Sequence, residues 1–347
     1  MNFKKKIYIE DLKLSDLSNF QKFLKNNFEK KHIFSNKNKI IYFQHLKKNK
    51  KIFNFKIVKI DNKIVGVHGY IPLKKFDEKL NKNQVFLSFL YSKPRLKFPT
   101  FPLTLREILK KNNFDFIGEI GLNKRLVPFH KSKGFEVSKM NQHVFLSNKI
   151  KKYDIAVVPN NIKKKKLIKT NNKFTYKELN ASFLKKNISK NIFLYQMPEK
   201  SNEYLINRYL NHPTFNYSIN GVFRTSKRLI LLFVLRKIKI KNSVIYKMVD
   251  LIGNQKDIPK IKYALNDILN KNNAEYIDLY SFGLSGEALK KSSFINVNNV
   301  KNLIVPNYFE PFKKKNVDLI CGYKCKFKNK VRIFRGDSDQ DQPRIIK

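Results

Sequence analysis

The sequence lacks several features that define common protein classes. It has no tryptophan and only two cysteines, Cys321 and Cys325, spaced four residues apart. One such pair is too little for a zinc site, so we expect no metal, reduced thiols and a cytoplasmic location. No apolar run reaches the roughly 18 to 20 residues of a membrane span. No apolar segment follows the N-terminal lysines either, so we expect no signal peptide.

Acidic residues are also scarce. The chain has 26 Asp and Glu against 73 Lys and Arg, which gives a formal net charge of +47. A polyanionic partner, either nucleic acid or an acidic membrane surface, is one explanation. The other is drift in an AT-rich genome, which favours Lys, Asn, Ile and Phe codons. The even spread of Lys and the scarcity of Arg favour drift, since readers of nucleic acid use Arg for bidentate base contacts. We therefore expect no nucleic-acid partner, although the charge should help to hold phosphate-bearing ligands.

Enough apolar residues remain to build cores, since 42% of the 347 residues are hydrophobic, and this length suggests two domains. The most informative unit lies at 84–135. Its pattern predicts a strand at 84–92, a loop with two prolines at 93–101, a helix at 102–111, a strand at 114–120 and a short amphipathic helix before Gly134.

The same pattern returns about 160 residues later. The segment KNNFDFIG at 111–118 is matched by KNNAEYID at 271–278, and each is preceded by a helix pattern and an apolar strand. A repeat of order, spacing and residue type indicates two copies of one α/β fold. The alternative is chance similarity in a chain rich in Lys and Asn.

The remaining patterns complete this division. The region 1–50 looks helical, Asp61 and Asn62 join a hairpin, and 137–146 reads as the strand that closes the first domain. In the second half we expect strands at 217–223, 228–237, 244–253 and 275–280, and helices at 258–269 and 287–291. We therefore predict a first domain at 1–150, a linker at 151–175 that includes a lysine run, and a second domain at 176–347.

The order of elements resembles the GNAT acyltransferase superfamily. The resemblance implies two tandem GNAT-like domains, each a mixed twisted sheet flanked by helices. It also implies acetyl-CoA or another acyl-CoA as co-substrate, whose pyrophosphate binds where the first loop meets its helix. The family's Arg/Gln-x-x-Gly-x-Gly/Ala segment is incomplete in both halves. Arg95 matches its basic position, and the candidate cofactor residues of the two segments are Arg95 and Lys97 in the first half and Gly253, Asn254, Gln255 and Lys256 in the second.

A second segment, GLNKRLVPFHKSKGF at 121–135, resembles the superfamily's Asn…Phe-Tyr…Gly-Phe segment, with matches at Asn123, Phe129 and Gly134. His130 falls where a tyrosine often protonates the leaving thiolate. The resemblance therefore implies an acid role for His130, whose imidazole has a pKa near neutrality. The alternative is a surface histidine on an amphipathic helix.

The second half looks like a narrower group, the tandem-GNAT proteins associated with bacterial surface-polysaccharide biosynthesis. The similarity lies at 275–280, in PNYFEPF at 306–312 and in GDSDQDQP at 336–343. It implies an N-acyltransferase that moves an acyl group from a CoA or carrier-protein thioester to an amino group of a sugar or sugar nucleotide. Nothing in the sequence indicates the oligomeric state.

Acyl transfer to an amine requires a base, and the candidates are Glu119, Asp278 and Glu310, the last with Tyr308 beside it. Glu119 and Asp278 fall on the central strands of the two halves, where an unpaired buried carboxylate is costly. Their alternative role is a structural salt bridge, and that of Glu310 is a packed aromatic turn. Asp337, Asp339 and Asp341 alternate like the start of a calcium loop but lack its final Glu, so we expect a hydrogen-bonding turn.

Two other functions stay open at this point. One is a Fem-type transferase, which also has two GNAT domains and uses aminoacyl-tRNA, a substrate that suits the positive charge. The other is a non-catalytic relative that binds a sugar nucleotide, since both candidate CoA loops lack glycines of the motif.

Overall fold

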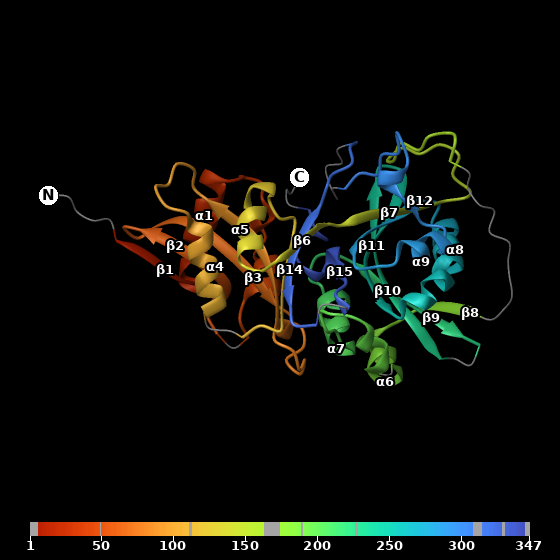
Figure 1. Cartoon of the computed structure of the whole chain (residues 1–347), viewed down its shortest axis with the longest axis horizontal. Coiled ribbons are helices and arrows are strands. Elements are labelled where there is room, and N and C mark those ends of the chain that lie inside the picture. Colours follow the sequence, from red (N-terminus) through yellow and green to blue (C-terminus); the bar gives the residue numbers. More distant parts are fainter. Residues whose placement is uncertain are drawn as a thin grey trace.

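A computed structural model describes residues 6–48, 50–110, 113–162, 174–188, 190–225, 228–307, 314–327 and 330–343. The chain folds into two mixed β-sheets flanked by helices, placed side by side (Figure 1). This confirms the predicted α/β class.

The first sheet is antiparallel except at its centre, where β4 and β5 run parallel. Its strands, in sheet order, are β1 (Ile7–Lys13), β2 (Ile52–Ile60), β3 (Lys63–Pro72), β4 (Gln84–Ser92), β5 (Phe116–Ile120), β14 (Ile320–Cys325) and β6 (Glu136–Lys139). The predicted hairpin joins β2 to β3, and Asp61 and Asn62 both have positive φ, as such a two-residue turn requires.

The second sheet repeats this plan, with β11 and β12 as its parallel pair. Its strands, in sheet order, are β13 (Ile295–Asn296), β7 (Asn141–Leu146), β12 (Ala274–Phe282), β11 (Ser243–Gly253), β10 (Leu229–Ile240), β9 (Tyr217–Arg224) and β8 (Phe174–Glu178). A short strand, β15 (Ile333–Phe334), pairs with the end of β12.

Each sheet contains one strand from the other half of the chain. The prediction of a single closing strand at 137–146 was wrong, because the strand breaks at Met140, whose N–H donates to the Leu319 carbonyl (2.8 Å) and whose side chain enters the central core. Beyond this break β7 joins the second sheet, while β14 crosses back between β5 and β6, as Figure 1 shows. The two halves are therefore connected by strand pairing as well as by the linker.

The helices follow the predicted order, with an unpredicted strand, β1, ahead of the first. They are α1 (Leu17–Asn27), α2 (Ile33–Asn36), α3 (Asn38–His45), α4 (Thr100–Lys110), α5 (Val127–Ser132), α6 (Ala181–Asn187), α7 (Asn202–Leu205), α8 (Lys262–Lys271) and α9 (Gly286–Lys291). In the ranges that the structure describes, no helix has both the length and the apolar character needed to cross a bilayer.

Apolar packing places α4 and α5 over the β4–β5 pair and α8 and α9 over the β11–β12 pair. The largest core lies between the sheets and draws side chains from both halves, including Phe86, Phe116, Tyr209, Val249 and Ile333. The arrangement is consistent with two domains of one fold that share a central core.

Candidate functional site

The parallel strands of the first sheet separate partway along their length. Residues 84–87 of β4 pair with residues 116–119 of β5, and the last pair is Leu87 with Glu119. Beyond it, residues 88–92 pair with β3 only, and no described strand covers the edge that faces β5. All five of these residues are half-buried, although they belong to a central strand. We call the place beyond Leu87 and Glu119, where this pairing stops, the first fork.

The corresponding opening in the second sheet is filled. There β11 and β12 pair as far as Met248 and Leu279, which defines the second fork. The strand β15 pairs with β12 at Ser281 and Phe282, and Arg332 just before it donates from Nη1 to the Gly253 carbonyl (2.6 Å). Residues 245–253 of β11 are all buried. The C-terminal segment of the chain thus occupies the second fork.

The predicted cofactor residues of the second half come together in a closed turn at the end of β11. Asn254 caps the 3-10 helix Gln255–Ile261 by accepting from Lys256 N (3.0 Å). Gln255 reaches across to the loop after β12, donating to the Gly283 carbonyl (3.3 Å) and accepting from Ser285 N (2.6 Å). These bonds tie together the two loops that would have to part to admit a ligand.

The predicted cofactor residues of the first half lie on the surface. Arg95 and Lys97 are exposed in the loop that connects β4 to α4, and Arg95 has a φ of 61°. Asn123 is also exposed and caps a short 3-10 turn ahead of α5 by accepting from Arg125 N (3.0 Å). Their side chains are therefore accessible to a ligand at the open side of the first sheet.

Glu119 and His130 meet beside the first fork. His130 Nε2 lies 2.8 Å from Glu119 Oε2, and its Nδ1 lies 2.9 Å from the Leu126 carbonyl. The ring is fully buried and stacks on Phe101 at 5.2 Å, so it is not the surface histidine of the alternative. Burial lowers the pKa of His130, but the hydrogen bond and charge of Glu119 outweigh it and leave the pKa raised. Glu119 therefore favours the protonated form of the ring.

Asp278, the predicted base of the second half, lies in a buried ion pair. Its Oδ2 accepts from Lys247 Nζ (2.8 Å) and from Gln142 Nε2 (3.2 Å), and Lys247 also donates to the Pro306 carbonyl (2.8 Å). Burial lowers the pKa of Lys247 to about 8. This is the salt bridge considered as the alternative role. The remaining candidates, Tyr308 and Glu310, lie outside the described residues.

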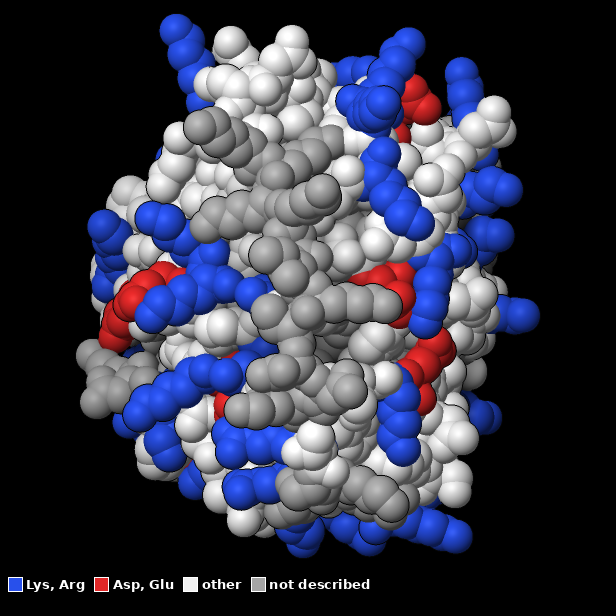
Figure 2. All heavy atoms as spheres, turned by 90° about the vertical axis from the view of Figure 1, so that its right-hand side faces the viewer, with Lys and Arg blue, Asp and Glu red and all other residues white. Residues whose placement is uncertain are grey.

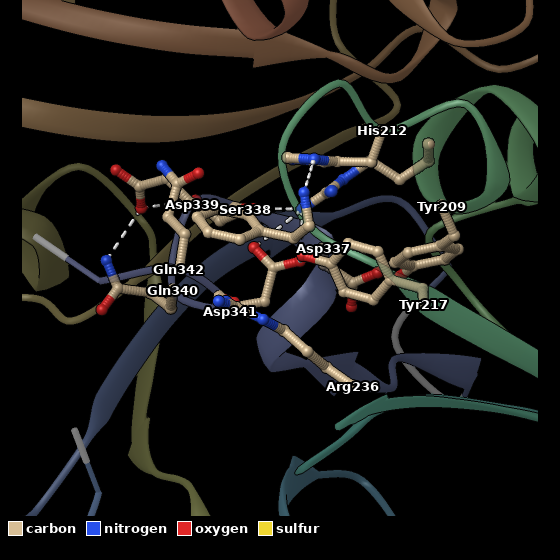
Figure 3. A network of polar contacts seen from close by, with 12 residues as sticks. Tyr209, His212, Tyr217, Arg236, Asp337, Ser338, Asp339, Gln340, Asp341 and Gln342 are labelled. Carbon is tan, nitrogen blue, oxygen red and sulfur yellow. Dashed lines mark hydrogen bonds and ion pairs between the residues drawn. The ribbon is translucent and has the colours of Figure 1, made fainter. Parts of the chain in front are cut away.

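The acidic C-terminal segment forms a turn at 336–343 between the two halves, which we call the C-terminal turn (Figure 3). Asp341 pairs with Arg208 (2.9 Å) and accepts from the Tyr217 hydroxyl (2.8 Å). Asp337 pairs with Lys200 (2.6 Å), a fully buried residue. Asp337 and Asp341 thus bind different cations and do not converge on one point, which agrees with a hydrogen-bonding turn.

Lys200 also pairs with Asp250 on β11 (2.7 Å), whose other oxygen accepts from the Tyr209 hydroxyl (2.9 Å). Burial lowers the pKa of Lys200, but the two carboxylates leave it raised, whereas burial raises the pKa of Asp337 to about 6. Sequence reasoning missed Lys200 and Arg208, and it gave Asp250 no role in the site. The sequence offers one indication of these residues, which is the acidic run in a basic chain. If such carboxylates are buried, they need buried cations as partners.

Comparisons with known proteins bear on the fold. No protein-family model matches the chain, and no curated protein matches it. Among solved structures, it resembles a GCN5-related N-acetyltransferase from Anabaena variabilis (TM-score 0.55, 10% identity), over 91% of this chain and 72% of that one. It also resembles an Enterococcus faecalis protein described as a probable N-acyltransferase (TM-score 0.52, 10% identity), over 92% of this chain and 73% of the other.

A third similar structure is N-myristoyltransferase from Saccharomyces cerevisiae with bound myristoyl-CoA, with a TM-score of 0.50 and 11% identity over 93% of this chain and 79% of that one. Identities at this level establish the fold and leave the chemistry to the residues of the site.

Proposed function

We propose, from the fold that it shares with GCN5-related N-acetyltransferases, that the chain transfers an acyl group from a coenzyme A thioester to an amino group. The observation that supports this best is the difference between the two forks. At the first fork no strand among the described residues pairs with the edge of 88–92 that faces β5, whereas the second fork is occupied by β15 and closed by Gln255. The donor therefore binds in the first half.

The first fork suits the chemistry of coenzyme A. The edge of 88–92 that no described strand pairs with presents backbone N–H and C=O groups, which can pair with the two amides of the pantetheine arm. Arg95 and Lys97 lie in the next loop, just before α4 begins at Thr100, where backbone N–H groups and the helix dipole also favour phosphate. The net charge of +47 adds a general attraction for a phosphate-bearing donor.

Within this proposal, the Glu119–His130 pair supplies the proton that the leaving thiolate takes. Glu119 raises the pKa of His130 and so favours the protonated ring, and Glu119 stands at the last pair before the strands separate. Phe101 and the other apolar side chains around the ring exclude water from the pair.

The acceptor in this proposal is an amino sugar or sugar nucleotide of surface-polysaccharide biosynthesis, and its support is the resemblance of the C-terminal segments. The Fem-type alternative would need a surface for tRNA. Figure 2 shows the end of the molecule formed by the second half, where the visible Lys and Arg are scattered rather than gathered in one stripe. A dedicated nucleic-acid surface usually shows such a stripe, and the described residues visible on this face do not form one.

Two matched variants test where the donor binds. Lys97→Gln and Lys256→Gln each remove one exposed lysine from the loop after a fork. Isothermal titration with acetyl-CoA should show about tenfold weaker binding for Lys97→Gln, the usual effect of one lost charged contact, and no change for Lys256→Gln. Equal losses in both variants, or a loss only in Lys256→Gln, would contradict a donor site in the first half.

Hydrogen exchange gives an independent test. Acetyl-CoA should slow amide exchange at 88–92, because it covers the free edge, and leave 249–253 of β11 unchanged. A protein that binds no acetyl-CoA in either experiment, and releases no thiol with amino-sugar nucleotides, would refute the proposed function itself.

A further inference from the structure

A hollow of about 630 Å³ lies at one edge of the second sheet. It is formed mainly by β7, α9 and the segment 293–300, which contains β13. None of its described lining residues belongs to β4, β5, β11 or β12, so it is separate from both forks. We call it the β7 hollow. Its volume falls within the range of roughly 300 to 1,000 Å³ that is usual for small-molecule sites.

Two short elements leave this part of the sheet uncovered. The helices α8 and α9 pack over the β11–β12 pair, and α9 ends after six residues. The strand β13 has only two residues, Ile295 and Asn296, which pair with Val144 and His143 of β7. Because paired residues of antiparallel strands share a face, His143 and Asn296 both line the hollow. The floor of the hollow is therefore fixed by strand pairing.

The floor is apolar apart from one buried polar ring. Phe145 and Phe294 are buried, and their rings meet edge to face at 5.8 Å. His143 is only 4% exposed, and its Nδ1 is buried without a hydrogen bond to a described residue. Burial lowers the pKa of His143 to about 4, against a smaller opposite effect of the Asn141 backbone, so the ring is neutral. A buried nitrogen without a partner is costly, and a ligand that hydrogen-bonds to it removes this cost.

One cation lies at the exposed rim. Lys290 lines the hollow from α9, and its side chain is exposed. The single acid of this helix, Glu287, is bound by Lys291 at 2.6 Å. Lys290 pairs with no carboxylate in the part of the chain that the structure describes. Its charge can therefore be neutralised by a ligand.

We propose that the β7 hollow binds an amphipathic organic anion, which is a molecule with an apolar or aromatic body, one neutral hydrogen-bonding group and one carboxylate. Phe145 and Phe294 contact its body, and burial of that body supplies most of the affinity. His143 binds the neutral group, because a buried neutral ring disfavours a second charge beside it. Lys290 binds the carboxylate. This site does not depend on the proposed acyl transfer, whose donor binds in the first half.

The probe 4-benzoylbenzoate has this chemistry, since it carries two aromatic rings, a ketone and a carboxylate. Isothermal titration at near-physiological ionic strength should show one molecule bound per chain. Lys290→Gln should weaken binding at least about threefold, whereas Lys291→Gln, which removes the neighbouring paired charge, should weaken it less than about twofold. The uncharged 4-benzoylbenzamide should bind the wild type more weakly than the acid. No binding to the wild type, equal losses in the two variants, or equal affinities of acid and amide would each overturn the proposal.

The imidazole is tested by His143→Phe, which keeps an aromatic ring and removes both ring nitrogens. Its affinity for 4-benzoylbenzoate should fall about threefold or more, the usual effect of one lost hydrogen bond. A urea midpoint no lower than that of the wild type would show that the fold is intact, because Nδ1 makes no bond that the change could break. An unchanged affinity would contradict the role of His143.

Photo-cross-linking locates the site, because the ketone of 4-benzoylbenzoate inserts into nearby C–H bonds on irradiation. Peptide mass spectrometry should find the label within 143–148 and 290–300. Excess acetyl-CoA should not reduce this labelling, whether or not the chain transfers acyl groups. Label spread over many lysine-rich peptides would show only a general attraction to the charge of +47, and displacement by acetyl-CoA would show that the hollow is not a separate site. Either result would overturn the inference.

Discussion

We predict that the folded chain loses stability steeply as the pH falls from 6.5 to 5. Four histidines are buried as neutral rings, with exposed fractions of 0% for His45 and His68, 4% for His143 and 9% for His212. Burial lowers their pKa values to about 3, 3, 4 and 2. His212 Nδ1 also accepts from Thr214 N (3.2 Å) and Phe215 N (3.0 Å), bonds that a proton would break.

The sign follows from proton uptake. Between pH 6.5 and 5 these histidines bind protons in the unfolded chain, where their pKa is about 6.5, and not in the folded chain, so unfolding is favoured as the pH falls. Each contributes a loss of about 1.6 kcal/mol over this interval, or about 6 to 7 kcal/mol for the four. All four folded pKa values lie below 5, so the loss depends little on their exact size.

Two groups act differently in the same interval. Burial raises the pKa of Asp337 to about 6, so between pH 6.5 and 5 the folded chain binds a proton here that the unfolded chain does not yet bind. This proton uptake offsets about 1 kcal/mol of the loss in stability. His130 has a raised folded pKa, so its contribution is complete below its unfolded value of about 6.5 and is lost only as the pH rises. The net loss is about 5 kcal/mol, a large part of the roughly 5 to 15 kcal/mol that stabilises an ordinary protein.

Urea unfolding at pH 6.5 and 5, at constant ionic strength, measures this loss. In His68→Gln the difference between the two pH values should shrink by about 1.6 kcal/mol, because one of the four titrating groups is gone. His130→Gln is the matched control and should leave the difference unchanged. A wild-type loss below about 1 kcal/mol, or equal effects of the two variants, would refute this account of the buried histidines.

Three further predictions concern single contacts. Lys200→Met should destabilise the fold by about 3 to 5 kcal/mol in urea unfolding, because it leaves Asp250 and Asp337 buried without their shared cation, and an unchanged midpoint would contradict this. Gly283→Ala should cost more than about 2 kcal/mol, since Gly283 has a φ of 81° and a Cβ would meet the Val331 carbonyl, whereas Gly286→Ala, with open space around it, should change stability by less than about 1 kcal/mol. His130→Gln should lower kcat about 10²-fold with little change in acetyl-CoA binding, and a fall in binding alone would argue against a proton role.

Local sequence patterns were sufficient for the elements that form the first fork. The apolar strand at 84–92, the helix before 114 and the turn at Asp61 and Asn62 are visible because neighbouring residues alone set their periodicity and φ angles. The match between 111–118 and 271–278 likewise indicated two halves with one order of elements. Glu119 was selected from its place on the central strand and His130 from the family resemblance of 121–135, but neither predicted the 2.8 Å contact between them.

Contacts between distant segments account for the rest. β7 and β14 are short apolar strands that fit either sheet by pattern, and their exchange depends on the break at Met140 and on the shared central core. Equally, two forks that look alike in sequence differ because β15 and Arg332 fill one of them. The C-terminal turn reads in sequence as an acidic run in a basic chain, and most of it is buried because Lys200 and Arg208 supply its cations from more than a hundred residues away in the chain. Backbone preference is a local property, whereas strand partners and charge compensation depend on which segments the core brings together.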